Sequence, residues 1–219
     1  MLNRYKENSI ILLKLEEIIE AIVRLLRDKY FYISLAVFVC GTELNFFSQT
    51  YLHNYIQGGG ALPKLSDLIL DNLPYWDFEY LYDVFILLSI FIFSTYVAHR
   101  RQYDKIPHVL FLCGIFYMTR GIFIVLTPFG SPEMFDGTNG IFKGFAEFEL
   151  GVYPSGHTGI SFMFFLLAKD NYYKLLLAAC VLVIILALFL SRAHYSIDVL
   201  SGFFFAYAIT SFGDKHLGY

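Results

Sequence analysis

Apolar segments long enough to cross a lipid bilayer recur along this chain of 219 residues. A transmembrane helix needs about 20 mostly apolar residues, because a rise of about 1.5 Å per residue must cover a hydrocarbon core of about 30 Å. We predict six spans, at residues 30–47, 80–98, 107–127, 154–168, 175–190 and 195–212. The fourth is shorter than the hydrocarbon core, so we expect it to be buried among its neighbours or to open below the lipid surface. The predicted fold class is all-α, a polytopic membrane protein built as a six-transmembrane-helix bundle.

The composition agrees with a membrane protein. The chain is 57% hydrophobic and only 16% charged, against roughly 25% charged residues in soluble domains. Cys40, Cys113 and Cys180 lie within apolar segments at spacings that fit neither a metal site nor a disulfide framework, and we interpret them as small core residues. No metal, no cofactor and no nucleic acid is predicted; the expected partners are membrane lipid substrates and the bilayer, and a homo-oligomer is compatible with the sequence.

The first 29 residues are predicted to form a cytoplasmic amphipathic helix. Apolar residues recur at helical spacing while charged residues fill the other face, the pattern of a helix at a membrane surface. The segment lacks the apolar stretch and cleavage site of a signal peptide. We therefore divide the chain into this helix (residues 1–29), a six-span catalytic membrane domain (30–213) and a cytoplasmic tail (214–219).

The distribution of basic residues predicts the orientation. Six spans place both termini on one side, which then carries twelve of the sixteen Lys and Arg residues, whereas the opposite loops hold only Lys64 and Lys143. By the positive-inside rule, the termini are predicted to be cytoplasmic. The remaining basic residues, Arg120 and Arg192, lie within the membrane region.

Two polar clusters interrupt the apolar C-terminal part of the chain, at residues 154–158 and 191–198. Ionisable groups at membrane depth are costly and usually functional. In the predicted topology His157, Arg192, His194 and Asp198 all lie at the outer ends of spans, and Arg120 lies about ten ångströms below the outer end of its own. We expect these side chains to share one extracytoplasmic pocket, with Glu43 and Asp83 nearby as buried hydrogen-bond partners.

The residue types in this pocket suit phosphoryl transfer. If the sixth span is helical from its start, the four-residue spacing of His194 and Asp198 places both on one helix face, where the carboxylate can orient the ring and leave its other nitrogen as a nucleophile. Ser155 is predicted to cap the fourth span, where the amides of Ser155 and Gly156 would bind an anion.

The predicted mechanism assigns a role to each of these groups. His194 attacks phosphorus to form a phosphohistidine, His157 donates a proton to the departing oxygen, and Asp198 stabilises the His194 cation. Arg120 and Arg192 hold the non-bridging oxygens together with the capping amides.

Two segments resemble the signature motifs of the type 2 phosphatidic acid phosphatase superfamily. These are the run Pro154-Ser155-Gly156-His157, and His194 followed by Asp198 and Val199-Leu200-Ser201-Gly202. The resemblance implies that the second histidine is the nucleophile, that the first is the general acid and that the substrates are lipid phosphates. Residues 62–71, residues 114–120 and residues 194–199 resemble the sphingomyelin synthase branch more closely. That likeness implies that Glu147 or Glu149 contacts a cationic headgroup.

Three functions remain open on the sequence. The first is a lipid phosphotransferase that passes a phosphoryl or phospho-headgroup unit to a lipid alcohol or to water. The second is a lipid phosphate or isoprenyl pyrophosphate phosphatase, and the third is a non-catalytic lipid-binding or scrambling protein. The active site is predicted to be extracytoplasmic, and the brevity of the chain favours a bacterial inner membrane.

Overall fold

The computed structural model describes residues 16–132, 150–151 and 153–216. The six-helix bundle predicted from the apolar segments is confirmed in these residues. Five helical segments are long and apolar enough to cross a membrane, and a shorter apolar helix, α6, completes the bundle. The long helices are α2 (Lys29–Gln57), α4 (Glu79–His99), α5 (Ile106–Leu126), α7 (Asn171–Leu190) and α8 (Ser196–His216), and α6 covers Gly156–Leu167.

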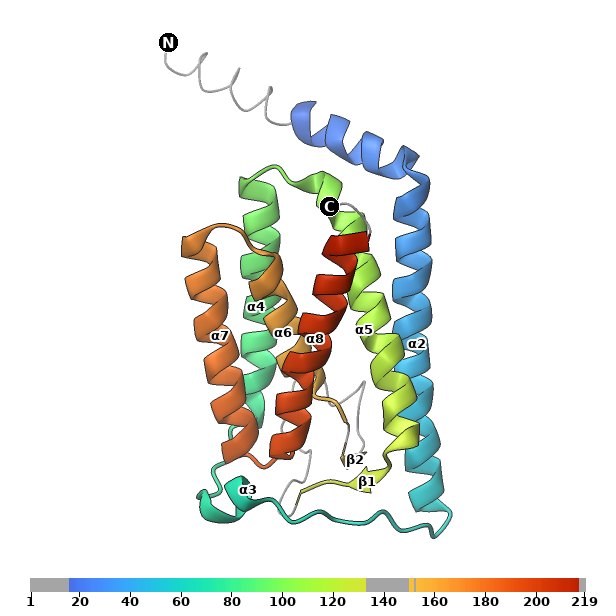
Figure 1. Cartoon of the computed structure of the whole chain (residues 1–219), viewed down its shortest axis with the longest axis vertical. Helices are drawn as coiled ribbons and strands as arrows, with labels where there is room; N and C mark the ends of the chain where they lie inside the picture. The colour runs from blue at the N-terminus through green and yellow to red at the C-terminus, as the bar shows by residue number, and fades with distance from the viewer. Residues whose placement is uncertain (1–15, 133–149, 152, 217–219) are drawn as a thin grey trace.

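Successive bundle helices alternate in direction, and both ends of the described chain lie at the same end of the bundle (Figure 1). We call this the terminal end and the other the site end. The site end carries three small elements: α3 (Leu68–Asn72) and the antiparallel pair β1 (Phe129–Gly130) and β2 (Leu150–Gly151). A short 3-10 helix, η1 (Tyr103–Lys105), precedes α5 at the terminal end. None of these four short elements was predicted.

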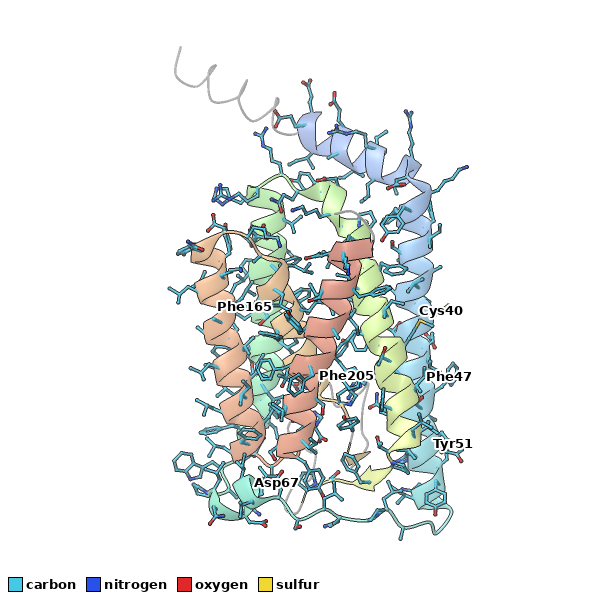
Figure 2. All side chains as sticks on the ribbon, in the orientation of Figure 1. Cys40, Phe47, Tyr51, Asp67, Phe165 and Phe205 are labelled. Carbon is cyan, nitrogen blue, oxygen red and sulfur yellow. The ribbon has the colours of Figure 1, made fainter. Side chains whose placement is uncertain are left out.

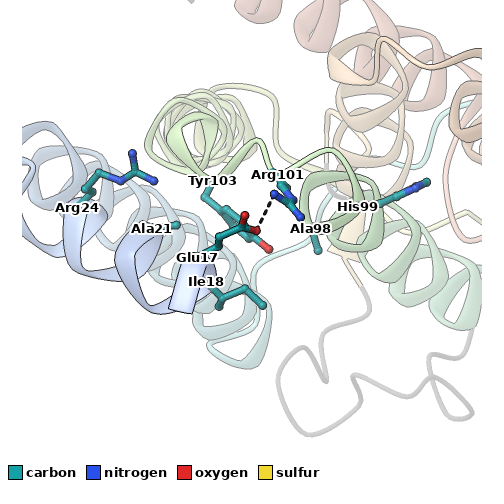
Figure 3. A pocket seen from close by; sticks show the side chains of 8 residues that line it. All are labelled: Glu17, Ile18, Ala21, Arg24, Ala98, His99, Arg101 and Tyr103. Carbon is teal, nitrogen blue, oxygen red and sulfur yellow. Dashed lines mark ion pairs between the residues drawn. The ribbon is translucent and has the colours of Figure 1, made fainter. Parts of the chain in front are cut away.

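The N-terminal helix is confirmed for residues 16–27, which are helical and lie across the terminal end at a steep angle to α2 (Figure 1). The Asp28 side chain accepts a hydrogen bond from the Tyr30 amide and thereby caps α2. An ion pair of 2.6 Å joins Glu17 to Arg101, beyond the end of α4 (Figure 3). Ile19 and Leu26 are exposed, as expected for a helix that lies at a lipid surface.

Helix α2 packs on α5 through small residues. A Cβ atom at Gly41 would lie 2.2 Å from the Gly114 carbonyl oxygen, and one at Gly121 would lie 3.0 Å from the Asn45 nitrogen. Such close backbone approach is typical of helix packing in membranes. The hydrophobic effect does not drive helices together in lipid, so association depends on the close van der Waals packing that small residues allow. Figure 2 shows Phe47 and Tyr51 on the outside of this pair, pointing away from the bundle.

Two predictions about α2 were wrong. The helix does not end at residue 47 but continues to Gln57, because its polar residues satisfy themselves within the helix; Ser48 and Thr50, for example, donate to the carbonyls one turn earlier. Glu43 is exposed rather than buried. Because successive helical residues are about 100° apart, Asn45 faces α5 and Glu43 faces outward.

The short helix α6 is the centre of the bundle and packs against α4, α5, α7 and α8. Most of its residues are buried, and Met163 is fully enclosed, so the prediction that the short span is buried among its neighbours is confirmed. The short connection from Leu167 to Asn171 joins α6 to α7 near the terminal end. Since α6 has 12 residues and α7 has 20, the start of α6 lies about 12 Å short of the far end of α7 if the two run side by side.

The C-terminal boundary also differs from the prediction. Helix α8 continues to His216, so at least part of the expected tail 214–219 extends the last span. Asp214 explains this extension, because its carboxylate contacts His108 of α5 and ties the last turn to the bundle.

Candidate active site

The start of α6 is built as a capped helix terminus. Ser155 is fully buried and its side chain accepts a hydrogen bond from the Thr158 amide, which confirms the predicted N-cap. The Ser155 amide donates to the backbone carbonyl of Asp198 at 3.0 Å. A Cβ atom at Gly202 would lie 2.9 Å from the Ser155 carbonyl oxygen, so the absence of a side chain there lets α8 approach. The two polar clusters of the sequence therefore meet.

His194 and Asp198 form the predicted pair. The Nδ1 atom of His194 lies 3.3 Å from Oδ2 of Asp198, and the two side chains are 5% and 0% exposed. The same carboxylate oxygen accepts from the Tyr195 amide at 3.0 Å, so Asp198 also caps the helix on which it lies. With Nδ1 bound to the carboxylate, the ring presents Nε2 away from Asp198, as a nucleophilic histidine requires.

His157 has a carboxylate partner of its own. Its Nε2 atom lies 3.1 Å from Oδ1 of Asp83 on α4, which is almost completely buried. The ring of Tyr82 packs edge-on against the same imidazole, with 4.9 Å between ring centroids. The prediction of Asp83 as a buried hydrogen-bond partner is confirmed, but its partner, 74 residues away, could not be deduced from spacing.

The two histidine rings are neighbours in an edge-to-face arrangement. Their centroids are 6.4 Å apart at an interplanar angle of 65°. His157, with 27% of its side chain exposed, is far more accessible than His194.

Arg120 is held across the start of α6. Its Nε donates to the Pro154 carbonyl at 2.9 Å and its Nη1 to the side chain of Asn45 at 2.6 Å. A Cβ atom at position 156 would lie 3.3 Å from Nε, so glycine is what allows the guanidinium to pack there. The charge of Arg120 is close enough to His194 and Asp198 to interact with both. Four of the predicted pocket residues, His157, His194, Asp198 and Arg120, therefore lie together at the start of α6.

The helix start provides fewer amides than predicted. The Ser155 amide is not available for an anion, because it donates to the Asp198 carbonyl. Among the described residues, the amides of Gly156 and His157 have no acceptor. The first turn of a helix offers such unpaired donors and a partial positive charge, so these two amides, with Arg120, are the groups of the site that can receive an anion.

Arg192 points elsewhere. Its backbone is in the left-handed region, with φ of 51°, and its Nη2 donates to the carbonyls of Leu70 and Leu73 at 3.1 and 3.2 Å. The structure therefore places the guanidinium against α3 and not beside the histidines. Glu147 and Glu149, the predicted headgroup contacts, lie outside the described residues.

Burial tunes His194 toward its neutral form. Removal from solvent lowers the pKa of this histidine below its ordinary value of 6.5, and the charges of His157 and Arg120 lower it further, while Asp198 acts in the opposite direction. The net effect is a lowered pKa. An imidazole that stays unprotonated at neutral pH is a competent nucleophile.

Comparison with known families gives one match. Residues 153–215 match the family described as PAP2 superfamily, C-terminal, and this segment contains both histidines and Asp198 but none of α2 to α5. No curated protein matches the chain at a significant level. The match supports the type 2 phosphatidic acid phosphatase superfamily and, together with the apolar helices, an integral membrane protein of phosphatase type.

Proposed function

We propose that this protein is a membrane enzyme that cleaves a lipid phosphate ester through a phosphohistidine on His194. The observation that carries the proposal is one arrangement of three groups. Asp198 engages Nδ1 of His194, the centroid of the His157 ring lies 6.4 Å from that of His194, and Arg120 lies against the capped start of α6. Phosphoryl transfer requires a nucleophile, a proton donor and fixed positive charge, and each is present here in one buried place.

In the first step Nε2 of His194 attacks phosphorus as the bond from phosphorus to the lipid oxygen breaks. The lipid oxygen leaves with a proton from His157, so the products are a lipid alcohol and an N-phosphorylated His194. Asp83 holds Nε2 of His157, so the proton is transferred from Nδ1, and the carboxylate stabilises the imidazolium before transfer. Asp198 has the equivalent role on His194.

In the second step an acceptor hydroxyl replaces His194 on phosphorus. His157, now neutral, takes the proton of the acceptor as the phosphorus–nitrogen bond breaks, which restores both histidines. Water as acceptor yields inorganic phosphate, and a lipid alcohol yields a new phospholipid. In both steps Arg120 and the amides of Gly156 and His157 donate hydrogen bonds to the phosphoryl oxygens and stabilise their negative charge.

Hydrolysis is the simpler outcome, because the matched family segment is of phosphatase type. Transfer to a lipid alcohol is the second candidate, and one observation favours it. Residues 62–71, which resemble the sphingomyelin synthase branch, contact the loop that carries His194: the Leu65 amide donates to the Tyr195 hydroxyl and the Ser196 amide to Asp67. We place the site at the extracytoplasmic side, since the terminal end carries the basic residues.

Purified protein in lipid nanodiscs, supplied with ³²P-labelled phosphatidic acid or with a headgroup-labelled phospholipid plus diacylglycerol, tests the proposal. Labelled inorganic phosphate indicates hydrolysis, and label in a new phospholipid indicates transfer. Absence of both products, with lipid movement between leaflets that persists in His194→Ala, would contradict the catalytic account and support a scrambling protein.

A further inference from the structure

Asp67 lies between α2 and α4, far in sequence from the histidines, and caps the five-residue helix α3. Its Oδ1 accepts hydrogen bonds from the amides of Ile69 and Leu70 at 2.9 and 3.2 Å. Such a cap stabilises the start of a helix, and it uses only one of the two carboxylate oxygens. The side chain is almost completely buried, so its other oxygen also needs a partner.

That second oxygen accepts from the backbone of the candidate active site. The Ser196 amide lies 2.6 Å from Oδ2 of Asp67. Burial raises the pKa of Asp67, but hydrogen bonds from the Ser196 amide and hydroxyl and from the amides of Leu70 and Ile69 outweigh it and hold the pKa below its ordinary value of 3.8. The group is therefore a charged acceptor at neutral pH, and hydrogen bonds to charged groups are the strong ones.

Ser196 is the first residue of α8, two residues after His194 and two before Asp198. The preceding amide, that of Tyr195, donates to Asp198. Two carboxylates from distant parts of the chain thus hold consecutive amides directly after His194. The Asp198 contact is local to α8, whereas the Asp67 contact fixes the start of α8 to a separate part of the protein.

Further contacts join the same two segments on both sides of His194. The Tyr195 hydroxyl accepts from the Leu65 amide and donates to the Gly130 carbonyl, each at 3.2 Å. Before His194, Arg192 donates to two carbonyls at the end of α3, and the Trp76 amide donates to the Leu190 carbonyl at 2.8 Å. The loop that carries His194 is therefore bounded by hydrogen bonds to residues 65–76, and Asp67 provides the shortest of them.

We propose that Asp67 is a positioning residue that fixes His194 against its phosphorus target by anchoring the start of α8; the inference rests on the proposed function. A displacement of about 1 Å can cost about 10²-fold in rate. Among the residues that the structure describes, the hydrogen bond that orients the His194 ring comes from Asp198, itself in the first turn of α8. Loss of the Asp67 contact should therefore slow the chemical step and leave lipid binding intact.

Two variants distinguish the proposed role of Asp67, anchoring the start of α8, from its role as the cap of α3. Asp67→Ser keeps a helix cap but is too short to reach Ser196. Ser196→Pro removes the donor from the opposite side, at a first helical position that proline tolerates well. Asp71→Asn is the matched control, because Asp71 lies in the same helix but is exposed.

Steady-state turnover in nanodiscs and amide hydrogen exchange of residues 191–200 are measured for all three variants. Both test variants are expected to lower kcat about 10- to 100-fold with KM within about twofold, and to speed exchange in this segment, whereas Asp71→Asn matches the wild type. A test variant with unchanged kcat, or with its loss confined to KM, would overturn the positioning role.

The exchange measurement needs no activity. It therefore distinguishes failure of this inference from failure of the proposed function. Turnover that survives His194→Ala overturns the proposed function, while unchanged exchange in Asp67→Ser overturns the anchor.

Discussion

Two buried histidine–aspartate pairs lie at opposite ends of this bundle, and only one of them is surrounded by the groups of a phosphate site. At the site end, His194 lies 3.3 Å from Asp198. At the terminal end, His108 of α5 also lies 3.3 Å from its partner, Asp214 of α8. Both histidines are buried, but Asp198 is fully enclosed whereas the Asp214 side chain is 39% exposed.

The difference lies in which nitrogen is bound and in what surrounds the ring. Asp198 holds Nδ1 of His194, with a second histidine ring, Arg120 and a helix start close by. Asp214 holds Nε2 of His108, and Lys169 lies 4.0 Å from the carboxylate. A histidine–aspartate pair alone therefore does not distinguish the candidate site; under the proposed function, Arg120 and the second histidine do.

The largest effect expected from this comparison is on turnover. His194→Ala removes the nucleophile and should lower kcat by about 10⁴-fold or more, as loss of a covalent catalyst does in other enzymes. His108→Ala should leave kcat within about twofold and destabilise the fold by about 2 kcal/mol or more, because a buried ring and its hydrogen bond to Asp214 are both lost. Initial rates and thermal unfolding in the same detergent measure both. Equal losses of activity in the two variants would contradict the distinction between the His194 pair and the His108 pair.

A smaller difference is expected between the two arginines. Arg120→Gln should lower kcat/KM by about 10²- to 10³-fold, because a preorganised positive group at the phosphoryl oxygens is lost. Arg192→Gln should lower it at most about tenfold and mainly reduce thermal stability, since this side chain holds the carbonyls of Leu70 and Leu73. The comparison is made with a soluble short-chain phosphatidic acid. If the Arg192 variant were as inactive as the Arg120 variant, the result would indicate that Arg192 also binds the phosphate.

The smallest expected effect is a shift in the pH profile. Only neutral His194 can attack, and burial lowers its pKa, so the acid limb of kcat/KM should lie below pH 6.5 and activity should be lost as the pH falls through it. Asp198 raises this pKa; Asp198→Asn should therefore move the acid limb to still lower pH while it lowers the maximal rate. Profiles from pH 4.5 to 8.5 measure the shift. An acid limb that moves to higher pH in Asp198→Asn would contradict its assignment to His194.

Local patterns predicted the parts of this site that local geometry determines. The four-residue spacing of His194 and Asp198 gave their contact, although His194 lies in the loop before α8 and not on a shared helix. Ser155 before an apolar run gave the cap. The apolar segments predicted the bundle because backbone groups in lipid must bond within their own helix.

Contacts between distant segments could not be predicted in this way. The partner of Asp83 is 74 residues away and that of Asp67 is 129 residues away. The direction of Arg192 depends on a left-handed backbone that no sequence pattern required, since most residues in that conformation are glycine. Asn45 rather than Glu43 faces Arg120 because of the rotation of α2, which its packing on α5 determines.

The central claim is that His194 carries the phosphoryl group, and the most direct measurement is trapping of the phosphoprotein. Protein in nanodiscs is mixed with ³²P-labelled phosphatidic acid, quenched in alkali within milliseconds and digested for mass spectrometry. We expect acid-labile, alkali-stable label on the peptide with His194 in the wild type and in His108→Ala, and none in His194→Ala. Label on another residue, or the same label in His194→Ala, would contradict the account.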